Sequence, residues 1–349
     1  MVVVALLLCV SVLFWGCAKE EPAENKKLPD KITILNWEEY MEMDVVKEFE
    51  KEYNIKVEFV YYVNEHEMIS IIQSDPGNYD LAVASGSIVE TMINLKLLER
   101  IDKNNIPNLS KVDKKFRIPP FDKNLDYSIP YLWGTSGLAV NRKYVKDEDI
   151  GWEILFDKRF KGKIDILDDI QEIFAPPLKI LGVSINTEDE RSLEAAKALL
   201  VEQKGIIRGY FDTIEIMKHL EDGTTYVAYL YSGDTYTAKD KNEYLDYIVP
   251  DDGAPMWIDN FVIPTNSKNK YAAELFINYV LKPKNIARIS NYLWYANAVP
   301  ESKRFLNEEL LNTENIYLTD EVLKRCEYYK PLMGKRNIFM NRVWAELTR

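Results

Sequence analysis

The sequence predicts an α/β fold, because segments with the periodicity of strands and of helices alternate along its first hundred residues. Residues 55–60 alternate apolar and polar side chains, as a half-buried strand does, and residues 79–84 form a short apolar run typical of a buried strand. Apolar side chains recur at helical spacing before each of these two segments. The order strand, helix, strand, helix, strand is a βαβ pattern, which implies a parallel sheet.

The elements of this first region follow in chain order. We predict a strand at 31–35, a helix at 45–53, a strand at 55–60, a helix around 68–72 and a strand at 79–84. The last strand ends in Ser85-Gly86-Ser87. Open α/β sheets bind their ligands at the carboxyl ends of parallel strands, so small polar residues at this place indicate a ligand site.

The second region begins with a segment interrupted by proline and glycine, residues 128–141, which we expect to be a strand crossing between two lobes. The strand predicted next, 164–167, runs directly into a helix that opens within 168–172. The remaining predicted elements are a helix at 193–201, strands at 225–230 and 257–264, and helices at 271–281, 284–293, 305–311 and 337–347. The chain contains no internal repeat and no low-complexity segment.

A hydrophobic segment lies at the N-terminus, where residues 2–15 are apolar apart from Ser11. This run is short for a membrane span and typical of the core of a signal peptide. It ends at Gly16-Cys17, which resembles a bacterial lipobox, so we predict a lipoprotein signal peptide at 1–16, lipid on Cys17 and a polar tether at 17–30. The alternative is an uncleaved anchor helix. Both interpretations place the rest of the chain outside the cytoplasm, in the periplasm and attached to a membrane.

The composition argues against several classes of function. A net charge of −12 disfavours nucleic acid as a partner, since phosphate binding needs a basic surface, and suits a cationic ligand. With two histidines and three cysteines, a zinc or iron site is not expected, and neither a metal nor another cofactor is predicted. The chain has no Walker motif, so ATP hydrolysis would belong to a separate subunit.

Three short segments, far apart in the sequence, place carboxylates beside or near an aromatic ring. They are Trp37-Glu38-Glu39-Tyr40, Asp168-Asp169-Ile170-Gln171-Glu172 with Phe174 after it, and Trp257-Ile258-Asp259. Ring faces attract cations, and carboxylates bind ammonium groups through charge-assisted hydrogen bonds. If the fold brings the three segments together, they form a cage for an organic polycation.

Each of these segments also has a purely structural interpretation. Asp169 followed three positions later by Glu172 is a capping-box pattern, which stabilises a helix start without a ligand, and Asp168 is the stronger candidate for a residue that only caps the helix. The two tryptophans fit equally well into a hydrophobic core. The Trp-x-Asp spacing favours the ligand site, because it places Trp257 and Asp259 on one face of a strand.

The residues in these segments, taken in order, resemble a known family, the spermidine/putrescine-binding proteins of bacterial ABC importers. The matching stretches span residues 31 to about 300: Asn36-Trp37-Glu38-Glu39-Tyr40, Tyr79-Asp80-Leu81 with Ser85, residues 126–134, Asp168-Asp169 with Glu172, Trp257-Ile258-Asp259 with Ile263-Pro264, Asn269-Lys270 and Tyr295. The resemblance implies two α/β lobes with the ligand cleft between them, as in type II periplasmic binding proteins. It also implies lobe 1 at 31–135 plus 257–303 and lobe 2 at 136–256 plus 304–349.

The same resemblance implies the function and the site. The chain would be a monomeric lipoprotein, not an enzyme, that captures a polyamine and delivers it to the membrane permease of an ABC importer. The implied ligand-binding residues are Trp37, Glu38, Glu39, Tyr40, Ser85, Ser87, Asp169, Gln171, Glu172, Tyr231, Trp257, Asp259 and Tyr295. Two positions depart from the family: Glu38 stands where threonine is common, and Ser87 replaces an aromatic residue. The cage is therefore more acidic and has fewer ring walls, which leaves the preferred polyamine open.

Two other functions remain open from the sequence. In the first, a protein of the same fold binds a different solute, such as a sugar, an amino acid or a thiamine-like cation. In the other, paired carboxylates serve an enzyme such as a glycosidase. Glycosidase carboxylates lie on opposite sides of the bond that is cleaved. Asp169 and Glu172 share one helical turn, so they suit capture of a cation better.

Overall fold

The computed structural model describes residues 27–313 and 315–349 and shows the predicted α/β fold. The predicted signal peptide, Cys17 and most of the tether lie outside the described residues. The strands are β1 (Lys31–Asn36), β2 (Lys56–Tyr61), β3 (Leu81–Ser85), β4 (Ser128–Asn141), β5 (Ile164–Leu167), β6 (Gly209–Phe211), β7 (Val227–Tyr231), β8 (Leu245–Ile248), β9 (Pro255–Val262), β10 (Ala296–Asn297) and β11 (Glu327–Tyr328). The helices are α1 (Met43–Tyr53), α2 (Glu65–Ser74), α3 (Gly86–Asn94), α4 (Ile170–Ile180), α5 (Glu190–Lys204), α6 (Thr213–Glu221), α7 (Ser232–Lys239), α8 (Lys270–Val280), α9 (Pro283–Leu293), α10 (Glu308–Asn312), α11 (Asp320–Leu323) and α12 (Gly334–Leu347).

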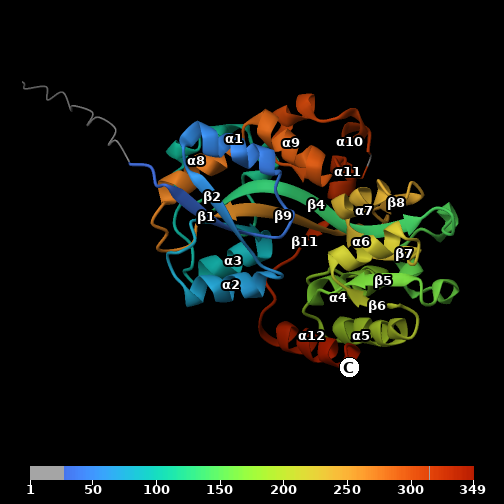
Figure 1. Cartoon of the computed structure of the whole chain (residues 1–349). Coiled ribbons are helices and arrows are strands. Elements are labelled where there is room, and N and C mark those ends of the chain that lie inside the picture. The colour runs from blue at the N-terminus through green and yellow to red at the C-terminus, as the bar shows by residue number, and fades with distance from the viewer. Residues whose placement is uncertain (1–26, 314) are drawn as a thin grey trace, which may run out of the picture.

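The predicted βαβ pattern is confirmed in the first lobe, where β1 pairs in parallel with both β2 and β3. On its other side β3 pairs antiparallel with β9, a strand that comes 170 residues later in the chain and lies between β3 and β4. Figure 1 shows α1 and α8 on one side of this sheet and α2 and α3 on the other. The sheet is thus covered on both faces, as the apolar runs in β1 and β3 require.

The long strand β4 joins the two lobes and confirms the predicted crossing strand. Residues 128–135 of β4 pair with β9, whereas residues 136–141 pair with β7 and β8. Every residue of β4 is buried. In the second lobe β5 lies between β6 and β7 and is parallel to both. In Figure 1, β4 and β9 run side by side from one lobe toward the other.

Each lobe has a hydrophobic core of its own. The first core surrounds β1, β3 and β9, and the second surrounds β5 and β7 and includes Met340 and Val343 of α12. Leu306, Leu310, Ile316 and Leu318 pack into the first core. The lobe boundaries expected from the sequence place residues 304–349 in the second lobe, and those boundaries stay a prediction.

One predicted helix starts later than expected. Residues 305–311 were expected to be continuous, but a 3₁₀ turn ends at Phe305, Leu306 is extended, and α10 begins only at Glu308. The reason is local, because the Asn307 side chain accepts a hydrogen bond from the Leu310 N–H at 2.8 Å and so caps a new helix. No helix in residues 27–313 and 315–349 has both the length and the apolar character needed to cross a membrane.

Candidate ligand-binding site

The predicted site residues lie where strands of the two lobes end. Trp37 follows β1, Ser85 ends β3, Asp169 comes two residues after β5, and Tyr231 ends β7. These are carboxyl ends of parallel strands, the place where α/β sheets bind ligands. Asp259 of β9 lies directly opposite Ser85 in the antiparallel pair. The expectation that the three scattered segments converge is therefore supported by the topology.

Aromatic rings form a continuous series through this region. Trp37 contacts Tyr40 with ring centroids 5.4 Å apart, and Tyr40 contacts Tyr295 at 5.9 Å. Tyr295 contacts Trp257 at 4.9 Å, and Trp257 contacts Tyr231 at 6.0 Å. All four contacts are edge-to-face, with interplanar angles of 60–85°. Each ring is thus fixed by its neighbours, and such contacts contribute about 0.5–1.5 kcal/mol each.

Local structure explains how the first segment presents its rings. The chain leaves β1 in a tight turn, in which the Asn36 side-chain amide donates to the Tyr40 carbonyl at 3.1 Å. Glu39 takes a left-handed backbone conformation, with φ of 58°, in the same turn. The turn leaves Glu38 and Glu39 exposed and Trp37 and Tyr40 half-buried.

Two glycines allow the rings of Trp257 and Tyr295 to lie close to the backbone. A Cβ atom on Gly134 would lie 2.5 Å from Cζ2 of Trp257, and one on Gly233 would lie 2.6 Å from Cε1 of Tyr295. Both glycines adjoin the ring series, Gly134 opposite Trp257 in the β4–β9 pair and Gly233 two residues after Tyr231.

We expect Gly134→Ala to displace the Trp257 indole, because the added methyl group occupies the place of the ring. Overpacking of this kind costs about 1–3 kcal/mol. The free energy of unfolding and the near-ultraviolet circular dichroism should both change. Gly205→Ala is the matched control, since its Cβ atom would be 3.6 Å from the nearest atom outside its chain neighbours. Unchanged dichroism in Gly134→Ala would contradict the close packing.

Asp259 is a buried carboxylate that adjoins the rings directly. It is 7% exposed, and Oδ2 accepts a hydrogen bond from the Tyr40 hydroxyl at 2.6 Å. Burial raises the pKa of Asp259 to about 7, and the hydrogen bond from Tyr40 opposes this shift only in part.

The second acidic segment corrects one prediction. Asp169, not Asp168, caps α4, because its Oδ1 accepts the N–H groups of Gln171 at 2.8 Å and Glu172 at 3.0 Å. Asp169 has the extended backbone that an N-cap requires. The backbone N–H of Asp168 bonds instead to the carbonyl of Phe211 beside it, and its side chain is exposed.

Glu172 turns into the protein instead of completing a capping box. Its Oε1 accepts the Ser136 hydroxyl at 2.8 Å, and its Oε2 accepts the hydroxyls of Tyr229 and Tyr329, the latter at 2.7 Å. Burial, followed by the charge of Asp169, raises the pKa of Glu172 to about 7. A carboxylate has about four acceptor positions, so three hydroxyls leave Glu172 little capacity for a further donor.

The remaining predicted residues differ in their surroundings. The Ser85 and Ser87 hydroxyls are 3.4 Å apart, and both side chains are half-buried. The side-chain amide of Gln171 donates to the Lys330 carbonyl at 3.1 Å, which ties α4 to the C-terminal segment.

The structure adds residues that the sequence analysis missed. Glu65, the first residue of α2, accepts hydrogen bonds from Ser85, and the charges of Asp259 and Asp169 help to raise its pKa. Asp234 of α7 is hydrogen-bonded to Tyr295, and burial raises the pKa of Asp234 to about 7. Tyr329 was missed as well. A helix start rich in acids, Glu65 and Glu67 after Asn64, was the only local signal for Glu65.

These carboxylates lack positive partners. Among the described residues, no lysine, arginine or histidine forms an ion pair with Glu65, Glu172, Asp234 or Asp259, and no positive charge lowers the pKa of any of them. Buried charges are costly unless they are paired. The site therefore places several carboxyl groups beside ring faces with no cationic side chain of the described residues to pair with them. The residues described also contain no group of three or more His, Cys, Asp or Glu placed to hold a metal ion.

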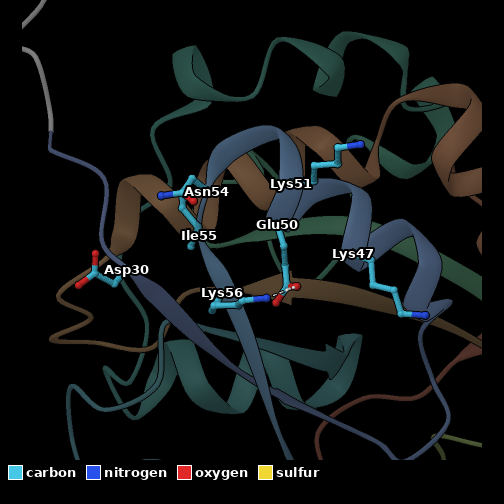
Figure 2. A pocket seen from close by; sticks show the side chains of 7 residues that line it. All are labelled: Asp30, Lys47, Glu50, Lys51, Asn54, Ile55 and Lys56. Atoms are coloured by element: carbon cyan, nitrogen blue, oxygen red, sulfur yellow. Dashed lines mark hydrogen bonds and ion pairs between the residues drawn. The ribbon is translucent and has the colours of Figure 1, made fainter.

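A hollow elsewhere on the surface has the opposite character. Figure 2 shows it beside α1 and the start of β2, where Lys47, Lys51 and Lys56 line it. Lys56 pairs with Glu50 at 3.0 Å across this hollow. None of the predicted site residues lines it. Its lysines make it unsuited to an ammonium ligand.

Comparison with known proteins identifies the class of this chain. Over 335 residues it is 28% identical to the spermidine/putrescine-binding periplasmic protein of Escherichia coli K12, covering 95% of each chain. The spermidine/putrescine ABC transporter substrate-binding protein PotD of Streptococcus pneumoniae shares its fold with a TM-score of 0.83 at 27% identity, covering 92% of this chain and 99% of that one. The Tp0655 (TpPotD) lipoprotein of Treponema pallidum gives 0.83 at 26% identity, covering 91% and 99%.

The family model for bacterial extracellular solute-binding proteins matches residues 44–313, most of the chain. Proteins of this class bind solutes for transport, which confirms the prediction of a binding protein and overturns the glycosidase alternative. The two-lobed periplasmic binding protein fold is confirmed by the solved structures. The chain belongs to the family of bacterial extracellular solute-binding proteins.

Proposed function

We propose that this protein binds a linear polyamine, such as spermidine or putrescine, in the region where the ring series meets the carboxylates. The observation that carries the proposal is the group of buried and half-buried carboxylates without a positive partner among the described residues. A ligand with several ammonium groups would supply the missing charges. A sugar or a zwitterionic amino acid would leave most of them uncompensated.

The rings complement the other part of such a ligand. A polyamine at neutral pH alternates ammonium groups with short methylene chains, which need flat apolar walls. Trp37, Tyr40, Tyr295, Trp257 and Tyr231 provide these walls in one series. A cation held over a ring face adds about 0.5–2 kcal/mol, depending on how far it is desolvated.

The proposed contacts divide by chemistry. Glu38, Glu39, Asp169, Glu172 and Asp259 are the proposed partners of ammonium groups, with Ser85, Ser87 and Gln171 as neutral polar contacts. In Asp169, Oδ1 caps α4 and Oδ2 accepts no hydrogen bond from the described residues; in Asp259, Oδ2 accepts from Tyr40 and Oδ1 accepts none from them. Both therefore retain more capacity than Glu172 to accept hydrogen bonds from a ligand.

The cellular role follows from the same proposal. The protein would act as a monomer outside the cytoplasm, held to a membrane by lipid on Cys17, and would deliver its ligand to the permease of an ABC importer. Two relatives carry names that fit this role, the periplasmic protein of E. coli and the lipoprotein of T. pallidum. Incorporation of radiolabelled palmitate into the full chain, and its loss in Cys17→Ala, tests the anchor.

Calorimetric titration of refolded, ligand-free protein with spermidine, putrescine, spermine and cadaverine tests the ligand. We expect at least one of them to bind with a dissociation constant of about 1 μM or lower, equivalent to about 8 kcal/mol. Raising the salt from about 50 mM to about 500 mM should weaken binding several-fold, because it screens ammonium–carboxylate contacts. Binding weaker than millimolar for all four amines would overturn the proposal. A neutral sugar that binds without salt dependence would replace it.

A further inference from the structure

Glu65 is held in place by two short hydrogen bonds at the end of β3. Its Oε1 accepts the backbone N–H of Ser85 at 2.6 Å, and its Oε2 accepts the Ser85 hydroxyl at 2.7 Å. Ser85 is the N-cap of α3, yet its side chain makes no capping hydrogen bond there. The hydroxyl that would normally cap α3 is therefore used to orient Glu65.

Four titratable groups from four parts of the chain interact electrostatically with this carboxylate. Asp259 comes from β9, Asp169 from the start of α4 in the other lobe, Tyr62 follows β2, and Tyr231 ends β7. None of them carries a positive charge. Desolvation, together with the charges of Asp259 and Asp169, raises the pKa of Glu65 to about 8, although the two hydrogen bonds from Ser85 oppose this shift.

We propose that Glu65 is a further ligand carboxylate of this site, oriented by Ser85, which binds an ammonium group between Asp259 of one lobe and Asp169 of the other. This inference rests on the proposed function. Each Glu65 oxygen uses one acceptor position for Ser85 and retains one for a ligand. The empty site holds a proton on Glu65, and an arriving ammonium group displaces that proton to solvent. Glu65 thereby makes the site select ligands of higher charge.

Glu65→Gln tests this proposal, because glutamine keeps an oxygen for the Ser85 N–H and removes the charge. Glu67→Gln is the matched control, since Glu67 lies in the same turn of α2, is exposed, and accepts only the Val63 N–H at 2.8 Å. At about pH 8.5, where Glu65 is ionised, we expect Glu65→Gln to bind spermidine about tenfold more weakly than wild type and putrescine less affected. Glu67→Gln should bind as wild type does.

The pH dependence of affinity separates a ligand carboxylate from a structural one. When ligand binding lowers the pKa of a carboxyl group, the affinity for the ligand increases with pH, by at most about tenfold per pH unit. The increase ends once the pH exceeds the pKa of that group in the empty site. Burial also raises the pKa values of Asp259, Glu172 and Asp234, so these groups contribute to the same rise, and the part that belongs to Glu65 is the difference between wild type and Glu65→Gln. Glu65→Gln should lose this part. Calorimetry in buffers of different ionisation enthalpy should show that Glu65→Gln releases fewer protons on binding than the wild type does.

The stability of the ligand-free protein provides a readout that needs no ligand. Because the folded protein binds the Glu65 proton more tightly than the unfolded chain does, stability falls as pH rises from the ordinary glutamate range to about 8. Glu65→Gln lacks this fall, so its thermal midpoint at about pH 8.5 should exceed that of the wild type by a few degrees. A merely structural glutamate predicts the reverse, since the substitution weakens its bonds to Ser85.

The outcomes distinguish the two proposals. Wild-type protein that binds no amine would overturn both the polyamine function and this role of Glu65. Normal wild-type binding, with Glu65→Gln equal to it in affinity and in proton release, would overturn the inference alone. If Glu65→Gln does not fold, Ser85→Ala is the substitute test. It keeps the charge of Glu65 but removes one of the two hydrogen bonds that orient the Glu65 carboxylate. It should weaken spermidine binding less than tenfold with proton release unchanged, and unchanged affinity would overturn the inference.

Discussion

Replacing Asp259 with asparagine is expected to weaken polyamine binding by roughly 30-fold or more without lowering the thermal midpoint. Removing one partner of a buried charged pair costs about 2–5 kcal/mol of binding energy. Asp259 is 7% exposed, and among the described residues its side chain accepts one hydrogen bond, from the Tyr40 hydroxyl. Asparagine has the same shape and keeps an oxygen for the Tyr40 hydroxyl. It also relieves repulsion from neighbouring carboxylates, so folding should not suffer.

Calorimetric titration and thermal unfolding of the same samples measure the two effects. Asp252→Asn is the matched control, because Asp252 is exposed and lies in the turn before β9, away from the rings. A large fall in the thermal midpoint of Asp259→Asn, with affinity retained, would show that Asp259 supports the fold and does not bind the ligand.

Truncation of Glu172 to alanine is expected to give the largest loss of stability, about 3 kcal/mol or more in the free energy of unfolding. The substitution leaves the hydroxyls of Ser136 and Tyr229 without their acceptor and the Tyr329 hydroxyl with only the Gln171 carbonyl at 3.4 Å, and each buried unsatisfied group costs about 1–3 kcal/mol. Ser136 and Tyr229 are buried, and Tyr329 belongs to the C-terminal segment after β11. The truncation therefore loosens contacts among β4, β7, α4 and this segment at once.

Glu172→Gln separates the scaffolding role from a ligand role. Glutamine keeps an acceptor oxygen and loses the charge, so it should retain most of the stability in denaturant titration. Because three hydroxyls already occupy Glu172, we expect Glu172→Gln to weaken polyamine binding less than Asp259→Asn does. Glu202→Ala on the exposed face of α5 is the control for helix truncation. A Glu172→Ala protein as stable as wild type would contradict the hydrogen-bond network.

Local sequence patterns predicted much of the fold. The order β1, α1, β2, α2, β3 follows from periodicity, because burial of one face imposes a period of about two on a strand and 3.6 on a helix. The long crossing strand β4 and the strand containing Trp257 and Asp259 were also expected. The residues that cap helices were harder to predict from the sequence than the helices themselves. Asp168 and Asp169 are chemically identical neighbours, and the residue at which α4 begins decides which of them is the cap: Ile170 directly follows Asp169, whose backbone is extended.

The sequence by itself determined the elements, the kinds of residue at the strand ends and the excess of negative charge. Only the tertiary structure decided which of them meet. Tyr40 and Asp259 form a hydrogen bond across 219 positions, and Tyr329 reaches Glu172 across 157. Glu65 joins the carboxylates because β3 pairs with the distant β9, which places Asp259 opposite Ser85. Such pairings depend on the packing of whole sheets, and no local pattern of apolar and polar side chains encodes them.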